Sequence, residues 1–146
     1  MSKRIEVPEK IKAIVKFALP TVDVRGMDTE EAKPERVGPL GMVIVRSGDP
    51  GDPEVDLCPP TYWWEHRIPI ELAAYQTASG NARAALDDMA RSIWALIEAD
   101  RTLGGLVLWT EAEAPTDGEV DQTGAKAIGW ADFAIIATYS TASPLG

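Results

Sequence analysis

The chain has 146 residues, with 14 basic and 23 acidic side chains and a formal net charge of −9. This length suits one domain, residues 1–146, that can bury a core without disulfides or a structural metal. The negative net charge is the wrong sign for binding nucleic acid or an anionic membrane. The single cysteine, Cys58, excludes an internal disulfide and a multi-cysteine metal site. Because no apolar run has the length of a signal peptide core or a membrane span, we expect a soluble protein made in the cytoplasm.

The first third of the chain predicts a helix followed by short strands. Residues 8–19 place apolar side chains at helical spacing, and Pro8 suits the first helical position. We therefore expect a helix of about three turns that ends before Pro20. It is followed by a β-prone run, a charged loop and a strand of β-branched residues, at residues 21–25, 26–38 and 41–46.

Residues 47–60 are dense in Gly, Asp and Pro, so we expect a long exposed loop there. Its acidic residues do not have the ligand spacing of an EF-hand, which argues against calcium. Residues 62–75 then predict a long strand, in which Pro69 indicates an edge position or a bulge. Alternation assigns its buried face to Tyr62, Trp64, His66, Ile68, Ile70, Leu72 and Ala74.

Residues 79–100 form the clearest pattern in the sequence, an amphipathic helix of about five turns. Ser79 and Asn81 are both candidates for its N-cap. The pair Gly104-Gly105 predicts the end of the helix, as glycines at a helix C-cap do. An apolar stripe must pack on another element, and the strands predicted on either side are the obvious partners.

The last part of the chain predicts a strand at residues 106–110, an acidic loop at 111–124 and a long strand at 126–141. The last strand carries apolar side chains on both faces, so we expect a helix or a second subunit to cover each face. The order of elements indicates an α+β fold, with a mostly antiparallel sheet of about four to five strands packed with two helices.

Residues with an obvious catalytic pattern are scarce, and we expect no enzyme, no cofactor, no metal and no catalytic residue. The one histidine, His66, is expected to pack between Trp64 and Ile68. A small enzyme, a transferase or hydrolase using His66 with Glu65 or Asp132, stays open as an alternative.

The five tryptophans are more than one small core accommodates, and large aromatic residues at the border of an apolar face are typical of protein contact surfaces. A second packed layer within the monomer is the alternative. The residues that we expect at a contact surface are Trp63, Arg67, Trp94, Arg101, Trp109 and Tyr139.

Several stretches have a familiar pattern: Val43–Glu54, Tyr62–Arg67, Leu86-Asp87-Asp88-Met89, Asp100–Leu106 and Tyr139–Gly146. Together they resemble tail terminator (tail completion) proteins of long-tailed phages and of proteobacterial prophages. The resemblance implies an α+β subunit that forms a hexameric ring on the finished tail tube, stops polymerisation and joins the tail to the head. Its partners would be further copies of itself, the tail tube protein and a head-completion protein, first in the host cytoplasm and then in the virion tail.

The acidity fits this interpretation, because a channel lined with carboxylates repels DNA over about a Debye length. We expect one of two acidic segments to face the channel. The candidate residues are Asp49, Asp52, Glu54 and Asp56 in the first and Glu111, Glu113, Asp117, Glu119 and Asp121 in the second. A monomeric module that binds another protein remains the other alternative.

Overall fold

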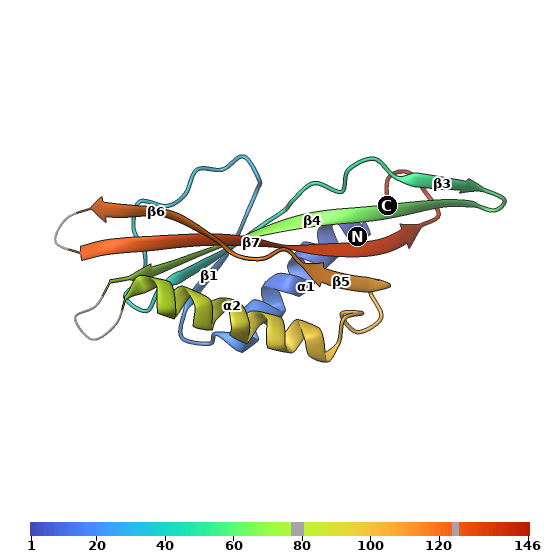
Figure 1. Ribbon diagram of the computed structural model, residues 1–146. Coiled ribbons are helices and arrows are strands. Elements are labelled where there is room, and N and C mark those ends of the chain that lie inside the picture. The colour runs from blue at the N-terminus through green and yellow to red at the C-terminus, as the bar shows by residue number, and fades with distance from the viewer. Residues whose placement is uncertain (77–80, 124–125) are drawn as a thin grey trace.

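The described part of the computed structural model comprises residues 1–76, 81–123 and 126–146, and the side chains outside 117–126 (Figure 1). It contains two helices, α1 (Lys3–Ala18) and α2 (Ala82–Ala99). The strands are β1 (Asp23–Met27), β2 (Met42–Arg46), β3 (Glu54–Leu57), β4 (Pro60–Tyr75), β5 (Trp109–Ala112), β6 (Thr116–Thr123) and β7 (Lys126–Thr141).

All of these strands join one sheet in the order β1-β2-β4-β7-β5, with β3 added to β4 and β6 added to β7. β1 runs parallel to β2, and the other pairs are antiparallel. The longest strands, β4 and β7, pair in unbroken register from Tyr62↔Thr141 to Tyr75↔Ile128. The expected α+β fold with a mostly antiparallel sheet and two helices is confirmed. The sheet has more strands than expected, because two segments predicted as loops are strands.

Both helices pack on the same face of the sheet, below it in Figure 1. The main core lies between the helices and the sheet. Asn81 caps α2, since its Oδ1 accepts the Ala84 N–H at 2.9 Å; the other candidate, Ser79, lies outside the described residues. The predicted face of β4 is buried from Trp64 to Ala74. The stripe of α2 packs on it through Leu86, Met89, Ala90, Ile93 and Ile97.

The start of the first helix was predicted wrongly. α1 begins at Lys3, and Pro8 lies inside it rather than at its first position. The reason is the buried stripe: Val7, Ile11 and Val15 follow one another at four-residue spacing against the sheet, so burial of Val7 extends the helix before Pro8. The proline removes one backbone donor, which the packing of α1 outweighs.

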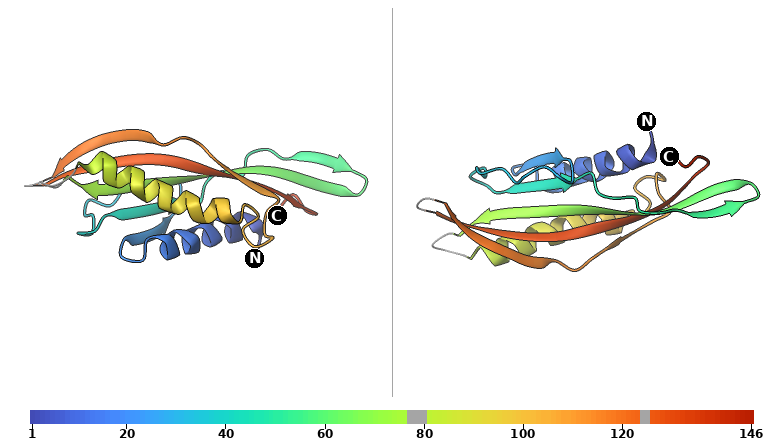
Figure 2. Two further views of the ribbon diagram at one scale, coloured as in Figure 1. Left: turned by 60° about the horizontal axis from the view of Figure 1, so that its bottom comes forward. Right: turned by 90° about the horizontal axis from the view of Figure 1, so that it is seen from above.

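The segment 47–60 is not wholly a loop, because Glu54–Leu57 forms β3 and pairs with the first residues of β4. β4 extends past the body of the sheet and offers a free backbone edge there, and the chain folds back to satisfy it. Together β3 and β4 make a two-stranded projection, residues 54–63, which we call the hairpin arm. Figure 2 shows it reaching beyond both helices.

The acidic segment 111–124 was also predicted wrongly as a loop. β5 covers Trp109–Ala112 instead of residues 106–110, and Thr116–Thr123 forms β6. Both strands pair with the same edge of β7, whose predicted bounds are confirmed. A strand of 16 residues has a long edge of backbone N–H and C=O groups that need hydrogen-bond partners. Even an acid-rich segment can supply them, because the pairing is made by the backbone.

Pro69 lies in an interior strand rather than at an edge, and β4 pairs with β7 through it without a register shift. On one side β4 pairs with β2 up to Val45↔Ile70, and the next pair, Asp49↔Arg67, is shifted by one residue. The missing N–H of Pro69 falls in this interruption of the ladder.

The face of the sheet opposite the helices is covered in part by the chain itself. Val37, from the loop between β1 and β2, joins Met42, Ile44, Ala73, Ile128 and Trp130 in a second apolar cluster. The hydroxyl of Tyr75 donates to the Val37 carbonyl at 2.6 Å. Over these residues the second face of the sheet is covered by a loop rather than by a helix.

Candidate functional site

Three of the predicted contact residues meet at the β5 edge of the sheet. The guanidinium of Arg101 lies between two indoles, with its Cζ 5.0 Å from the ring centroid of Trp94 and 4.6 Å from that of Trp109. Its Nη1 donates to Glu111 Oε1 at 2.9 Å. Trp109 is half exposed, so this aromatic–arginine cluster presents one stacked indole to solvent.

The turn after α2 positions Arg101. The helix ends at Ala99, and the C-cap is Asp100 rather than a glycine. The Asp100 carboxylate accepts the hydroxyl and N–H of Thr102 and the N–H of Gly104, and these bonds lower its pKa. The Thr110 hydroxyl donates to the Arg101 carbonyl at 2.9 Å, which ties the turn to β5.

The hairpin arm is amphipathic. Trp63 lies on one side of it, where the indole Nε1 donates to Asp56 Oδ2 at 2.8 Å. Val55 pairs with Tyr62, and Leu57 with Pro60, so these side chains continue the face of β4 that is buried further along. That face is bare on the arm, since Leu57 is 83% exposed and Val55 45% exposed.

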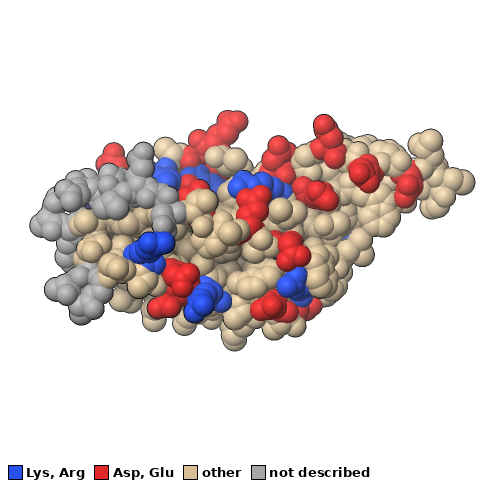
Figure 3. All heavy atoms as spheres, in the orientation of Figure 1, with Lys and Arg blue, Asp and Glu red and all other residues tan. Residues whose placement is uncertain are grey.

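Near the hairpin arm, acidic side chains gather on the face of the sheet opposite Val55 and Leu57. A hollow of about 480 Å³ is lined by Asp52, Glu54, Trp63 and Glu65. A smaller hollow of about 230 Å³ further along β4 contains Glu113 and Asp132 together with Arg46 and Arg67. We call Asp52, Glu54, Glu65, Glu113 and Asp132 the acidic face; Figure 3 shows a row of acidic residues along the upper side of the molecule toward the arm.

Arg67 links the two acidic segments that the sequence singled out. Its backbone pairs with Asp49 from the first, and its guanidinium donates to both carboxylate oxygens of Glu113 in the second, with Nη2 2.8 Å from Oε2. This hydrogen bond lowers the pKa of Glu113 and raises that of Arg67. The remaining candidates of the second segment, Asp117, Glu119 and Asp121, lie in β6, and their side chains are outside the described residues.

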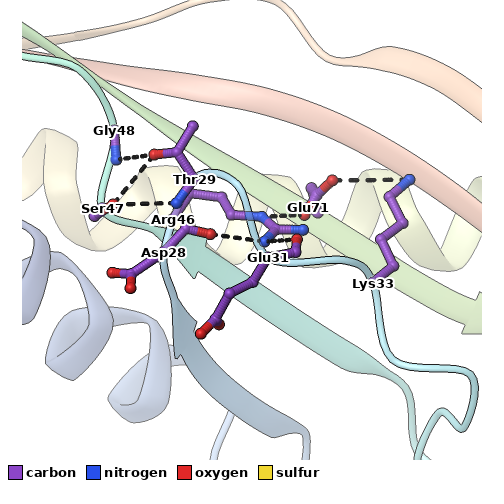
Figure 4. A network of polar contacts seen from close by, with 8 residues as sticks. All are labelled: Asp28, Thr29, Glu31, Lys33, Arg46, Ser47, Gly48 and Glu71. Atoms are coloured by element: carbon purple, nitrogen blue, oxygen red, sulfur yellow. Dashed lines mark hydrogen bonds and ion pairs between the residues drawn. The ribbon is translucent and has the colours of Figure 1, made fainter.

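A buried polar network that the sequence analysis missed holds the loop over the upper face (Figure 4). Arg46 Nε donates to Glu71 Oε2 at 2.7 Å, and Nη1 donates to the carbonyls of Asp28 and Glu31. Lys33 Nζ lies 3.7 Å from the other oxygen of Glu71. The sequence did carry a signal for this pair, since Arg46 and Glu71 are charged residues within predicted strands. A charge that is buried in a strand needs a partner of opposite charge.

His66 is buried as expected, but it is hydrogen-bonded rather than simply packed. Its Nε2 lies 2.8 Å from the Ser47 carbonyl, which accepts only, so Nε2 carries the proton and Nδ1 accepts from the Tyr139 hydroxyl at 3.1 Å. Burial lowers the pKa of His66 and raises that of Tyr139 to about 12. Tyr139 is therefore a core residue in this chain, and we leave it out of the contact surface.

The catalytic alternative lacks the geometry it needs. Glu65 is exposed on the face of β4 opposite His66. Asp132 pairs in register with Glu71, whereas His66 pairs with Ala137, five residues along β7. Both ring nitrogens of His66 are already engaged inside the core, where a substrate has no access.

Some of the tryptophans are packed inside the monomer and others are exposed as a contact surface would require. Trp64 and Trp130 are buried, Trp94 is partly buried, and Trp63 and Trp109 are exposed.

In the part of the chain that is described, no three His, Cys, Asp or Glu side chains gather in a way that could hold a metal ion. Neither of the described helices is apolar over a length that would cross a membrane.

Comparison with known proteins adds no assignment: no protein-family model matches the chain, and no curated protein matches its sequence.

Proposed function

We propose that this protein is a structural subunit of the tail-terminator type, which closes as a ring on the end of a phage tail tube, ends its polymerisation and joins the tail to the head. The observation that carries the proposal is the separation of two kinds of surface at one end of the molecule. The acidic face lies on one side of the sheet, and the bare apolar face of the hairpin arm lies on the other.

This separation is what a ring around DNA requires. The surface that faces the channel must repel phosphate, which Asp52, Glu54 and Glu65 can do. The surfaces that join neighbouring subunits must be apolar and unlike each other, because a head-to-tail contact pairs two different patches. In this arrangement Arg67 is neutralised by Glu113, so it does not offer a free cation to passing DNA.

The test begins with the mass of the purified protein by light scattering across a wide range of concentration, with and without tail tubes. The proposal expects a species of about six times 15.8 kDa, alone or on the tube ends, and tubes that stop growing when the protein is added. A protein that stays monomeric and binds no tube would contradict it and favour a monomeric binding module.

A second test addresses the channel. The triple change Asp52→Asn, Glu54→Gln and Glu65→Gln removes three negative charges from the acidic face while retaining side-chain size. Slower DNA ejection from particles that carry this variant is the expected result. The matched control neutralises acids on α2 instead, Asp87→Asn, Asp88→Asn and Glu98→Gln, and equal ejection rates in the two variants would remove the channel from the proposal.

A further inference from the structure

The hairpin arm carries an apolar surface that the described residues of the chain do not cover. Val55 and Leu57 continue the face of β4 that is buried further along, and the arm that carries them reaches past the end of both helices (Figure 2). Leu57 is 83% exposed, the highest value among the described large apolar side chains after the N-terminal Met1. An exposed, contiguous apolar strip on a projecting element is typical of a site of protein association.

A second apolar surface lies on the helical side of the molecule. A groove of about 370 Å³ runs between α1 and the turn that follows α2, and Lys10 and Asp100 lie among its lining residues. Phe17, near the C-terminal end of α1, lines this groove and is 80% exposed. Its other apolar lining residues are Ala13, Ile14, Leu96 and Leu103.

The two segments that carry these surfaces have opposite net charge. Residues 47–66, which contain the arm, carry five acids and no Lys or Arg. In contrast α1, Lys3–Ala18, carries five bases and two acids. Opposite net charge on the two segments steers the arm of one copy toward α1 of another and disfavours pairing of two arms or two α1 helices. The arm carboxylates Glu54 and Asp56 lie on its other face, so this attraction acts at a distance rather than as ion pairs within the contact.

Within one chain the two surfaces do not meet, because the arm projects away from the helices and α1 runs away from the arm (Figure 2). We propose that the arm of one copy docks on the α1 groove of the next copy, with its apolar face, Val55 and Leu57, against Phe17 and the other apolar residues of the groove. The contact is head-to-tail, so every copy offers one arm and one groove. It rests on the proposed function only for its closure into a ring.

The exposed Cys58 at the tip of the arm supplies the test, because it is the one cysteine of the chain. Ala13 lines the groove and is exposed, so Ala13→Cys adds a second thiol with little change in volume. Under mild oxidation the variant should form a ladder of disulfide-linked species beyond the dimer. The control is Ala85→Cys, an equally small change on the exposed side of α2, away from the groove.

Cross-linking of Ala13→Cys that exceeds the control and is lost on Cys58→Ser supports the docking. The same product pattern in the two variants overturns it. The result is separate from that of the proposed function: rings on tail tubes without a disulfide between positions 13 and 58 would leave the function and remove this contact, whereas that disulfide without tube binding would do the reverse.

A substitution that leaves the thiols unchanged gives an independent measurement. Leu57→Lys places a charge in the apolar groove beside Lys10 and should weaken self-association by roughly 30-fold or more. Leu40→Lys makes the same change at another exposed leucine, in the loop before β2, and should leave association unchanged. Equal association of these two variants, measured by sedimentation, would contradict the docking.

Discussion

Strand β4 passes through two environments along its 16 residues. From Ile68 to Ala74 its inward face is buried beneath the helices and its backbone pairs with β7 and, over part of that length, with β2. In the hairpin arm the same face continues through Val55 and Leu57, but neither described helix extends beneath the arm, and these side chains are exposed (Figure 2).

The comparison shows that alternation and burial are separate properties. Both regions place apolar side chains on one face, as the period of a strand requires. Burial of that face depends on the length of α1 and α2, and both helices stop short of the arm. The body of β4 therefore contributes to the stability of the fold, and the arm is available for association.

The sharpest way to break the comparison is one substitution made in both regions. Leu72→Ala in the body removes a fully buried side chain and should lower the free energy of unfolding by about 4 kcal/mol, through lost burial and the remaining cavity. Leu57→Ala in the arm should change it by less than about 0.5 kcal/mol. Urea denaturation measures both, and similar losses would show that the arm is part of the stable core.

The network around Arg46 tests how the body keeps its loop. Arg46→Leu leaves the partly buried carboxylate of Glu71 without its closest partner and should cost about 3 kcal/mol of unfolding free energy. The double variant Arg46→Leu, Glu71→Leu should recover part of this loss, since no unpaired charge remains. If the double variant is the less stable of the two in urea denaturation, burial of the lone carboxylate is not the cause.

His66 lies near the boundary between body and arm and makes stability depend on pH. Burial lowers its pKa in the folded chain, so below about pH 6.5, its unfolded value, the unfolded state binds more protons. The free energy of unfolding should therefore fall as pH falls, by at most about 1.4 kcal/mol per pH unit. His66→Gln should remove this component between pH 7 and pH 5, and an unchanged slope would assign the dependence to other groups.

The aromatic–arginine cluster predicts the smallest effect. Arg101→Lys keeps the charge but loses the planar stacking on Trp94 and Trp109, at a cost of about 1 kcal/mol. A change in tryptophan fluorescence should accompany it, because both indoles change environment. The matched control is Arg91→Lys on the exposed side of α2, for which we expect no measurable change in either signal.

The sequence alone determined the features that depend on neighbouring residues. Alternation in residues 62–75 predicted the buried face of β4, and a period of 3.6 residues predicted the stripe of α2. The strand at 126–141 was predicted with its bounds, and the residues predicted at a contact surface included Trp94, Arg101 and Trp109, which the fold brings together. Each of these predictions depends only on the types of residues that lie a few positions apart in the sequence.

Only the tertiary structure decided the rest. β3 and β6 lack a strong strand pattern and form because β4 and β7 leave long backbone edges that must be paired. Arg46 and Glu71 are 25 residues apart in the chain and meet only because β2 and β4 pair. The exposure of Leu57 and Phe17 depends on where distant helices end, since burial is decided by the whole packed arrangement rather than by local residue pattern.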